Sequence, residues 1–350
     1  MKIKRASVER LDLKLHTPYT IAYETVSEAT NLILRLETDD GHTGFGCAAP
    51  DLMVTGEKAA AAWEKARNLI APFLEGRNPF HYARILEELK SLPGSSPSLL
   101  AMADMALLDL AAKKADVPLY EFLGGYRDSI PTSITIGILS PEETLREARE
   151  CISQGFFILK IKGGNNVDED IEKILRLREE FPKVILRFDG NQGYSAEEAI
   201  AFVQGTQAAN IEIFEQPTRI SKEKKLGKVT KNVHIPVMAD ESIKTLADAF
   251  RLARNERIDM VNIKLMKVGG ILEGQHINSV ARSAGLEAMV GCIDECALGI
   301  SAGLHFALSR HNVQYADLDG HLDMVSDPFK GLFRLEKGIL YPGKKAGLGV

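Results

Sequence analysis

The run FFILKIK at residues 156–162 is followed by VILRFDGN at residues 184–191, and both turn from apolar side chains to charged ones. Similar runs recur along the chain. They begin at Ser133, Phe156, Val184, Ile211, Ile235, Met260, Leu286 and Val313, with start-to-start spacings of 23, 28, 27, 24, 25, 26 and 27 residues. Segments between them, such as 141–155, 168–180 and 196–203, have helical periodicity. Eight strand-plus-helix units of near-equal length predict an α/β protein with a (β/α) barrel.

The first 125 residues have a different pattern. Strands are expected at residues 3–15 and 31–36 with a loop between them, a turn at 41–46, and helices at 56–74, 82–92 and 98–114. This order predicts an α+β domain before the barrel. The predicted organisation is a capping domain at 1–125, the barrel at 126–325, and a C-terminal segment at 326–350 that packs back onto the capping domain.

Composition and charge argue against several classes of protein. The net charge is −5, from 43 basic and 48 acidic residues, so neither nucleic acid nor a membrane surface is an expected partner. Residues 1–10 alternate charged and apolar side chains, unlike a signal peptide, and no run of 18 apolar residues occurs. The four cysteines form no Cys-x-x-Cys pair. We therefore expect a reduced, cytoplasmic protein.

Two lysines, Lys160 and Lys162, end the second expected strand. Side chains alternate along a strand, so both lysines point to one face, while Leu159 and Ile161 point to the helix layer. A solvated edge strand is the alternative, which the apolar lead-in disfavours. The lysines are therefore predicted to face the barrel axis at the C-terminal end of the strands, where such barrels carry their chemistry.

Three carboxylates end the next three expected strands. Asp189, Glu215 and Asp240 are 26 and 25 residues apart, which is one strand-plus-helix unit each. Such side chains converge at one end of the barrel, and converging carboxylates repel one another unless a cation holds them. Oxygen ligands suit a hard divalent ion, so the three residues are predicted to bind Mg²⁺. Helix N-caps are the alternative role for one or two of them.

The sixth expected strand carries Lys264, which is predicted to lie across the barrel from Lys162. A divalent cation would stabilise the enediolate that forms when a proton leaves the carbon beside a carboxylate. Each lysine could remove or return that proton on one face, and crowded cations are expected to lower the pKa of a lysine. Two opposed bases predict inversion at carbon, which is racemisation or epimerisation.

Together these motifs resemble the muconate-lactonizing subgroup of the enolase superfamily over essentially the whole chain. The matching residues are Lys160-x-Lys162, Asp189-Gly-Asn191, Glu215-Gln-Pro217, Ala239-Asp240-Glu241-Ser242, the segment from Asn262 through Lys264 to Gly270, and the segment from Ala101 to Leu110. The resemblance implies a modified (β/α)8 barrel of the TIM type, (β/α)7β, with an N-terminal α+β capping domain. It also implies Mg²⁺ as cofactor and Lys162 and Lys264 as the acid–base pair. A homo-oligomer is expected.

The last expected strand helps to distinguish branches of this family. Its end, Asp317-x-Asp319, resembles that of the dipeptide epimerases, where the pair implies binding of a free α-ammonium group. Two carboxylates on one face without a local cation also favour a positive ligand, although a barrel-filling role is the alternative. The seventh strand end, residues 290–295, contains no His, which disfavours the mandelate-racemase-like branch.

By the same resemblance, Thr135, Lys160 and Cys292 lie near the substrate, and Lys160 neutralises its carboxylate. A small buried strand residue is the alternative role for Cys292. The activity implied is that of an isomerase, a dipeptide epimerase. An o-succinylbenzoate synthase or N-acylamino acid racemase is the next candidate, followed by a cycloisomerase. A binding or structural protein on a degenerate barrel is the alternative from another class.

The substrate side chain is predicted from the loop before Val26. Relatives that act on Ala-Glu carry an Arg in this loop, whereas this chain has Tyr23 and Glu24. A Glu would repel an acidic substrate side chain, and the neighbouring Tyr and Ile side chains could contact an apolar one. Hydrophobic or cationic residues are therefore expected in place of Glu or Asp. If Glu24 points to solvent, Tyr23 makes the contact and only the hydrophobic preference follows.

Overall fold

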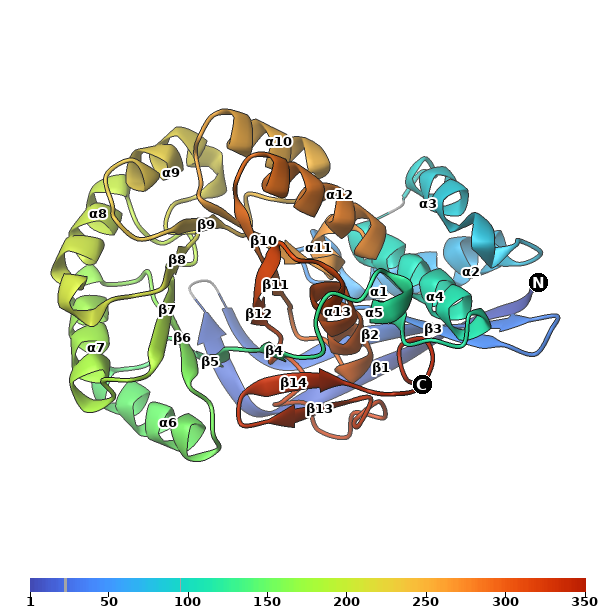
Figure 1. The fold of residues 1–350 in the computed structure, drawn as a ribbon, viewed down its shortest axis with the longest axis horizontal. Coiled ribbons are helices and arrows are strands. Elements are labelled where there is room, and N and C mark those ends of the chain that lie inside the picture. The colour runs from blue at the N-terminus through green and yellow to red at the C-terminus, as the bar shows by residue number, and fades with distance from the viewer. Residues whose placement is uncertain (22–23, 95) are drawn as a thin grey trace.

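The computed structural model describes residues 1–21, 24–94 and 96–350, and the side chains of residues 17–26 are outside the description. An eight-stranded parallel sheet lies inside an arc of helices in the left-hand part of Figure 1, in the order β12-β11-β10-β9-β8-β7-β6-β5. The strands are β5 (Ile134–Ile136), β6 (Ile158–Lys162), β7 (Ile185–Asp189), β8 (Ile213–Glu215), β9 (Val237–Ala239), β10 (Met260–Lys264), β11 (Glu287–Gly291) and β12 (Val313–Asp317). Each strand lies within one of the predicted runs, so the eight-strand prediction is confirmed.

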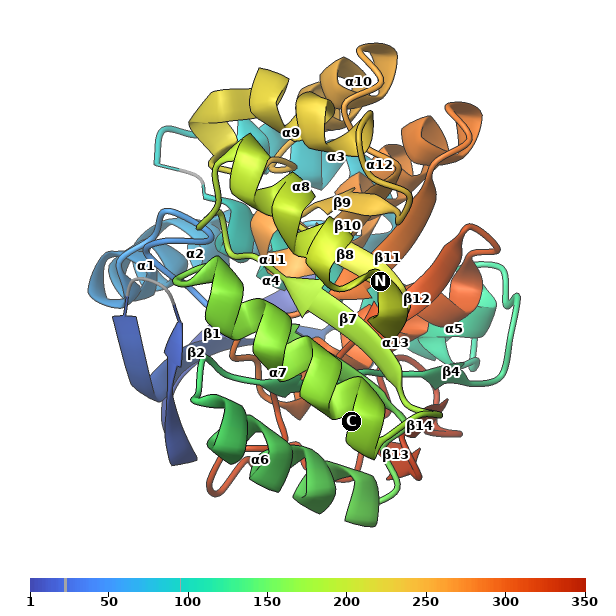
Figure 2. The ribbon, with the colours of Figure 1, turned by 90° about the vertical axis from the view of Figure 1, so that its left-hand side faces the viewer.

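The sheet curls into a nearly closed barrel. Thr132, just before β5, forms an isolated parallel bridge with Ala316 of β12, and the Ser133 amide donates to the Ala316 carbonyl at 3.2 Å. Each pair of consecutive strands is connected by a helix on the outside, as Figure 2 shows for α7 and α8 beside β7. These helices are α6 (Pro141–Ser153), α7 (Val167–Glu180), α8 (Ala196–Gly205), α9 (Glu223–Thr230), α10 (Leu246–Arg254), α12 (Ile271–Ser283) and α13 (Ala297–Ser309). In the described part of the chain no helix follows β12, which makes this the (β/α)7β form.

Local sequence explains where several of these helices begin. The Ser140 hydroxyl accepts from the Glu143 amide, and the Glu143 carboxylate accepts from the Ser140 amide in return, at the start of α6. Ser195 with Glu198 and Thr245 with Asp248 form the same reciprocal pair at α8 and α10. Such capping boxes satisfy amides that have no partner inside the helix, so they fix the point at which each strand-to-helix loop ends.

Residues before the barrel form an antiparallel sheet covered by helices. The strands are β1 (Ile3–Ile21), β2 (Glu24–Thr38) and β3 (Thr43–Ala48), and the helices are α1 (Ala59–Lys65), α2 (Ala71–Leu74), α3 (Tyr82–Lys90), α4 (Pro97–Lys114) and the short α5 (Leu119–Phe122). A π-helical turn, η1 (Ala66–Ile70), joins α1 to α2. The predicted α+β cap is therefore present.

Two local predictions in this domain are wrong. Most of the loop expected between residues 15 and 31 is strand, because β1 continues to Ile21 and β2 begins at Glu24. The turn expected at 41–46 is largely strand β3. The glycines of β3 serve close packing instead of a turn, since a Cβ on Gly46 would lie 1.9 Å from the Met102 carbonyl oxygen of α4.

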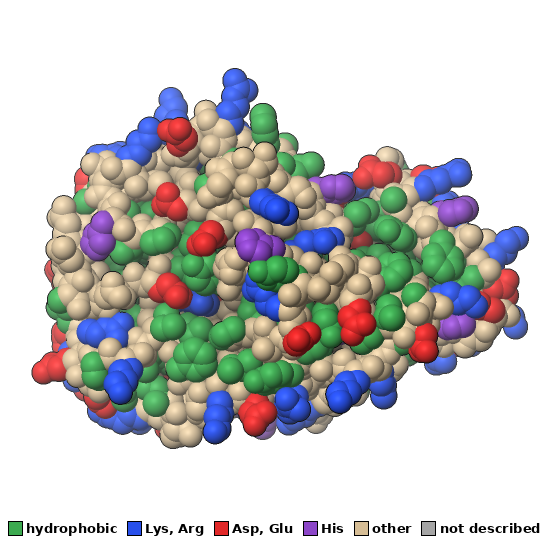
Figure 3. Space-filling view, in the orientation of Figure 1, with side chains coloured by type: hydrophobic (Ala, Val, Ile, Leu, Met, Phe, Trp, Pro, Cys, Tyr) green, Lys and Arg blue, Asp and Glu red, His purple; other side chains and the backbone are tan. Residues whose placement is uncertain are grey.

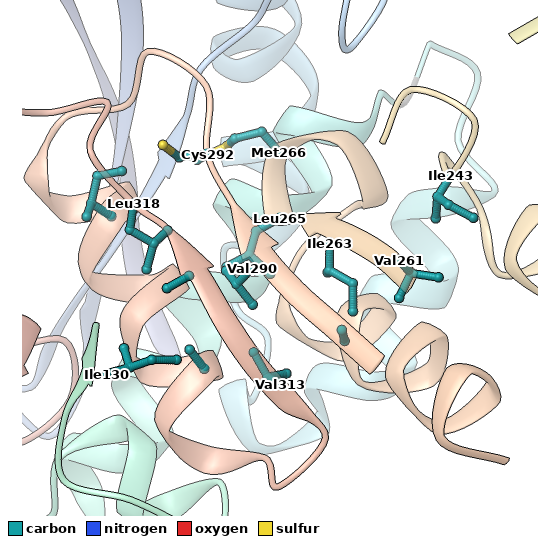
Figure 4. Packing of buried hydrophobic residues seen from close by; sticks show 14 of the residues in the cluster. Ile130, Ile243, Val261, Ile263, Leu265, Met266, Val290, Cys292, Val313 and Leu318 are labelled. Atoms are coloured by element: carbon teal, nitrogen blue, oxygen red, sulfur yellow. The ribbon is translucent and has the colours of Figure 1, made fainter. Parts of the chain in front are cut away.

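Alternation along the barrel strands separates two apolar layers. Val261, Ile263, Val290 and Val313 belong to the main core, which Figure 4 shows at strands β10 to β12. A separate cluster inside the barrel consists of Ile213, Met238, Met260 and Met289. In β10, Met260 therefore faces inward while Val261 faces the other way, and the same alternation turns Asn262 and Lys264 toward the barrel axis.

Buried polar groups join the N-terminal domain to the barrel. Asp104 of α4 accepts from the Ile271 and Leu272 amides at the start of α12, at 2.5 and 3.3 Å. Asn31 of β2 donates to the Asp294 carbonyl at 3.1 Å and accepts from the Cys296 amide at 2.9 Å. These bonds fix the cap against the C-terminal side of β10 and β11.

The end of the chain contacts both parts of the molecule. Strands β13 (Phe333–Glu336) and β14 (Ile339–Pro342) form a small sheet with β4 (Ile130–Pro131), which precedes the barrel. Farther on, the Leu348 amide donates to Asp109 of α4 at 2.7 Å, and the Leu119 amide donates to the Gly347 carbonyl at 2.8 Å.

Charged side chains of both signs are interspersed over the face shown in Figure 3, without an extended patch of one sign. Among the helices that the structure describes, none has the length and apolar character needed to cross a bilayer.

Candidate active site

Five neighbouring strand ends carry a row of charged side chains. In sheet order these are Lys162 (β6), Asp189 (β7), Glu215 (β8), Asp240 (directly after β9) and Lys264 (β10). Lys162 pairs in register with Asp189, and Asp189 with Glu215. The row thus has a lysine at each end and three carboxylates between them, and its two lysines lie on strands four positions apart in an eight-stranded barrel.

The three carboxylates are buried: Asp189, Glu215 and Asp240 expose only 1%, 2% and 3% of their surface. Lys160, two residues before Lys162 on the same face, lies among them. Its Nζ is 3.1 Å from Asp189 Oδ2 and 2.8 Å from Glu215 Oε2. A buried carboxylate is strongly destabilising without such compensation, so this lysine is part of the charge balance of the site.

Two other lysines balance the negative charge of Asp240. Lys264 Nζ lies 2.8 Å from Asp240 Oδ2, and the fully buried Lys267 lies 2.6 Å from Oδ1. Lys267 also donates to the Asp240 carbonyl. Lys162 is held less tightly, at 3.5 Å from Asp189 Oδ2. The two ends of the row therefore differ in how firmly their lysines are fixed.

Burial and charge act in opposite directions on the titration of these groups. Burial tends to raise the pKa of Asp189, but the charges of Lys160 and Lys162 outweigh burial and hold this pKa below its ordinary value. For Glu215 burial prevails over Lys160 and raises the pKa to about 7. Burial would lower the pKa of Lys264, but Asp240 raises it instead. In the protein alone, carboxylates outweigh cations around this lysine, so the expected lowering of its pKa stays a prediction for the protein with its divalent cation bound.

The loops after these strands are strained and cross-linked. Asn191, Gln192 and Gln216 have positive φ angles of 42°, 65° and 31°, which cost energy in residues other than glycine. Gln216 Oε1 accepts from the Asp240 amide at 3.0 Å and from the Ser242 amide at 3.2 Å. Its side chain thus sets the position of the loop that carries Asp240.

The donor set fits a divalent cation. As the structure stands, no three His, Cys, Asp or Glu side chains of the described residues form a ready metal-ligand group, and Lys160 contacts both Asp189 and Glu215. Yet Asp189 Oδ2 and Glu241 Oε2 are buried, and no described residue donates a hydrogen bond to either. Three buried carboxylates on adjacent strand ends, one of which has an oxygen that lysines approach without a hydrogen bond, suit a hard ion such as Mg²⁺. Asp189, Glu215 and Asp240 would hold it.

Strand β12 and its neighbour β5 bring together the other predicted residues. Asp319 Oδ2 accepts from the Thr135 amide at 2.7 Å, and Cys292 Sγ lies 3.8 Å from Asp319 Oδ1. Asp317 is buried and contacts Lys160 at 2.8 Å. The premise that this pair has no local cation is therefore wrong for Asp317, because the long Lys160 side chain reaches it across the barrel seam.

Asp319 is in a different electrostatic position from Asp317. Burial and the nearby Asp317 charge raise the pKa of Asp319. Within residues 1–21, 24–94 and 96–350, no Lys or Arg lies at ion-pair distance from it. Asp319 is therefore the carboxylate of the pair that is available to a cationic ligand.

The residues predicted to contact the substrate side chain are only partly described. Tyr23 lies outside the described residues. Glu24 is the first residue of β2, but its side chain is outside the description. In strand β1 of the same hairpin, the Leu15 backbone forms an isolated bridge with the Met324 backbone. This bridge places the β1–β2 hairpin beside the loop that follows Asp319.

Several site residues were not assigned a role from the sequence. Asn262 Nδ2 donates to Glu215 Oε1 at 2.6 Å, and Ser133 Oγ donates to Asp317 Oδ1 at 2.6 Å. Glu241 is buried beside Asp240, and burial raises its pKa to about 8. The alternation that places Lys160 and Lys162 on one face also places Asn262 with Lys264, so a signal for Asn262 was present. Lys267 lies three residues after Lys264, in the short helix α11 (Leu265–Val268). Only the tertiary structure reveals that its partner is Asp240.

Comparison with known proteins identifies the family. Residues 143–350 match the family described as "Enolase C-terminal domain-like", and residues 4–124 match "Mandelate racemase / muconate lactonizing enzyme, N-terminal domain". The chain is 43% identical to an L-Lys-D/L-Arg epimerase of Desulforapulum autotrophicum, over 100% of this chain and 99% of that protein.

Solved structures agree with this assignment. A dipeptide epimerase from Enterococcus faecalis, complexed with Mg and L-Leu-L-Tyr, has a TM-score of 0.97 and 37% identity, covering 100% of this chain and 99% of that one. A dipeptide epimerase from Methylococcus capsulatus, complexed with Mg and L-Arg-D-Lys, has a TM-score of 0.95 at 37% identity with the same coverage. This chain belongs to the enolase superfamily, in the mandelate racemase and muconate lactonizing enzyme family.

Proposed function

We propose that this protein is a Mg²⁺-dependent dipeptide epimerase, an isomerase that moves the proton on the carbon next to the dipeptide carboxylate. The observation that carries the proposal is the row of Lys162, Asp189, Glu215, Asp240 and Lys264 on five neighbouring strand ends. A lysine at each end of a carboxylate row provides a base and an acid on opposite sides of one substrate carbon.

The lysines are the groups that transfer the proton. One lysine removes the α-proton from one face, and the other delivers a proton to the opposite face, so the configuration is inverted. Lys162 and Lys264 fit these roles because they lie on strands four positions apart and both reach the carboxylates between them. Mg²⁺, when bound, supplies positive charge that stabilises the enediolate and offsets the carboxylate charge that raises the pKa of Lys264.

Two further groups are proposed to bind the carboxylate end and the ammonium end of the dipeptide. Lys160, buried among the carboxylates, provides a positive charge for the substrate carboxylate. Asp319 is proposed to bind the free α-ammonium group, with Asp317 holding Lys160. Thr135 and Cys292 contact Asp319 and so lie where the dipeptide N-terminus is placed.

This assignment separates the proposal from its nearest alternative. An N-acylamino acid racemase or o-succinylbenzoate synthase would use the same lysines and carboxylates, but its substrate has no ammonium group. A partly buried carboxylate that pairs with no described lysine or arginine favours the approach of a cationic ligand. Asp319 is in that position, which favours a free dipeptide.

We further propose that the epimerised residue is hydrophobic or cationic. The support is the Glu24 position in the hairpin next to the barrel mouth, together with a relative, 43% identical, that is named an L-Lys-D/L-Arg epimerase. We also propose that the enzyme is a cytoplasmic homo-oligomer. The support for the location is that all four cysteines are free.

The proposed activity is tested directly by incubating the protein with Mg²⁺ and a dipeptide library in D₂O. We expect mass increases of one deuterium at the α-carbon of selected dipeptides, together with appearance of the second diastereomer. A protein that incorporates no deuterium into any dipeptide, but does so into N-acylamino acids, would favour the racemase instead.

The metal site is tested by chelation and by one substitution. Chelation should abolish activity and Mg²⁺ should restore it, and Asp240→Asn should lower Mg²⁺ affinity at least about tenfold in titration calorimetry. Asp259→Asn, at the other end of β10, is the matched control and should bind Mg²⁺ normally. Full activity after exhaustive chelation would exclude the metal-assisted mechanism.

The lysines are tested one at a time. Lys162→Ala and Lys264→Ala should each abolish epimerisation, because inversion needs both faces. Each variant should still exchange the α-hydrogen of one isomer in D₂O, and by family resemblance Lys162 serves the R isomer and Lys264 the S isomer. Lys183→Ala, just before β7 at the opposite end of the barrel, should behave like the parent. Normal epimerisation by either active-site variant would refute the two-base mechanism.

The ammonium site is tested with Asp319→Asn. Loss of a charge-assisted contact costs about 1.5–3 kcal/mol, so KM for free dipeptides should rise roughly 10- to 150-fold. N-acetylated dipeptides should be poor substrates for the parent, and the substitution should not affect them further. If N-acetylated dipeptides turn over as well as free ones in the parent, the racemase assignment replaces this one.

The side-chain preference is tested with Ala-Glu, Ala-Leu, Ala-Phe and Ala-Lys. The parent should have its lowest kcat/KM with Ala-Glu, because like charges in a closed site repel. Glu24→Arg should raise activity on Ala-Glu and lower it on Ala-Lys, with Glu24→Gln intermediate for both. An unchanged ranking in Glu24→Arg would show that Glu24 takes no part.

A further inference from the structure

A buried ionic cluster lies directly behind the loop that follows Lys162. Asp170 in the first turn of α7 exposes 2% of its surface. Its Oδ2 accepts from the Gly164 amide at 2.9 Å and from the Tyr194 hydroxyl at 2.6 Å, and its Oδ1 lies 2.9 Å from Lys173 Nζ. Lys173 and Tyr194 are also buried. One carboxylate thus joins the loop after β6, helix α7 and the loop after β7.

The two loops that Asp170 joins are interlocked. A Cβ on Gly164 would lie 2.2 Å from the Gly190 carbonyl oxygen, and a Cβ on Gly193 would lie 2.1 Å from the Gly164 carbonyl oxygen. Gly190 directly follows Asp189, and the Gly163 amide donates to the Asp189 carbonyl at 3.0 Å. A shift of the Gly163–Gly164 segment therefore changes the relation between Lys162 and Asp189.

The Lys162 side chain has little else to hold it. Among the described residues its ionic contact is the 3.5 Å approach to Asp189 Oδ2, and 16% of the side chain is exposed. Lys264, by contrast, contacts Asp240 at 2.8 Å and is more deeply buried. The position of Lys162 Nζ must then depend more strongly on its backbone than that of Lys264 does.

We propose that Asp170, anchored by Tyr194 and Lys173, is a positioning residue for Lys162 and acts on one half of the proton transfer only. The inference rests on the proposed two-lysine mechanism and adds a residue set whose hydrogen bonds and ion pairs involve none of the proposed metal ligands. Proton transfer is sensitive to geometry, and a misplacement of about 1 Å can reduce a rate about 100-fold.

Tyr194 allows the hydroxyl to be separated from the ring. The ring packs with Phe188, Phe202 and Phe214, at centroid distances of 6.3, 5.8 and 6.4 Å, and the hydroxyl donates to Asp170. Tyr194→Phe keeps the packed ring and removes one of the bonds that hold the Asp170 carboxylate. Asp170→Asn keeps an oxygen acceptor for Gly164 and removes the charge that faces Lys173.

The test measures α-hydrogen exchange in D₂O for each diastereomer separately. Lys162→Ala and Lys264→Ala first show which isomer depends on which lysine. Tyr194→Phe should slow exchange of the Lys162-dependent isomer about tenfold or more, and leave exchange of the Lys264-dependent isomer within about twofold of the parent. Asp170→Asn should give the same bias between isomers.

Tyr315→Phe is the matched control, because it also removes a tyrosine–carboxylate bond, to Glu287 at 2.9 Å, at the other end of the barrel. It should slow neither isomer selectively. Equal slowing of both isomers by Tyr194→Phe, or no slowing, would overturn the positioning role while leaving the epimerase assignment intact. Absence of exchange in the parent would overturn the epimerase assignment and this inference with it.

Discussion

Charge balance in a buried layer is the constraint on which the rest of this structure depends. Burying an isolated ionised group costs several kcal/mol or more. A partner of opposite charge offsets this cost only when the two groups are in close contact with good geometry. Asp189, Glu215, Asp240 and Asp317 are all buried, and Lys160, Lys264 and Lys267 contact them at 2.6–3.1 Å. These lysines and carboxylates must therefore be retained as one set.

The barrel separates this charged layer from the apolar one that stabilises the fold. An apolar cluster fills the barrel interior one layer below the charged strand ends and packs against them. It consists of Ile213, Met238, Met260 and Met289. Strand alternation makes the arrangement possible, because a strand that turns Val261 and Ile263 to the helices must turn Asn262 and Lys264 to the axis. Packing on one face and chemistry on the other are consequences of the same backbone.

The parts of the molecule that can be predicted from the sequence are those that follow local rules. The eight strands, their spacing and the charged row could be predicted, since strand period and unit length place each residue. Strand β3 was missed because Gly44 and Gly46 look like turn residues, whereas they permit close contact with α4, which no local pattern reveals. The Lys160–Asp317 and Lys267–Asp240 pairs were missed for a similar reason. Long side chains choose partners across the barrel, and only tertiary geometry determines which partner is in reach.

The division between cap and barrel separates the charged row from the hairpin that carries Glu24. The row is fixed by barrel strands, while the hairpin that carries Glu24 belongs to the cap and meets the barrel through the Leu15–Met324 bridge and Asn31. A change in that hairpin leaves the buried charge balance intact, because none of its described side chains belongs to the row. Substitutions of exposed cap residues therefore cost little stability, whereas the buried row is under the stricter electrostatic constraint.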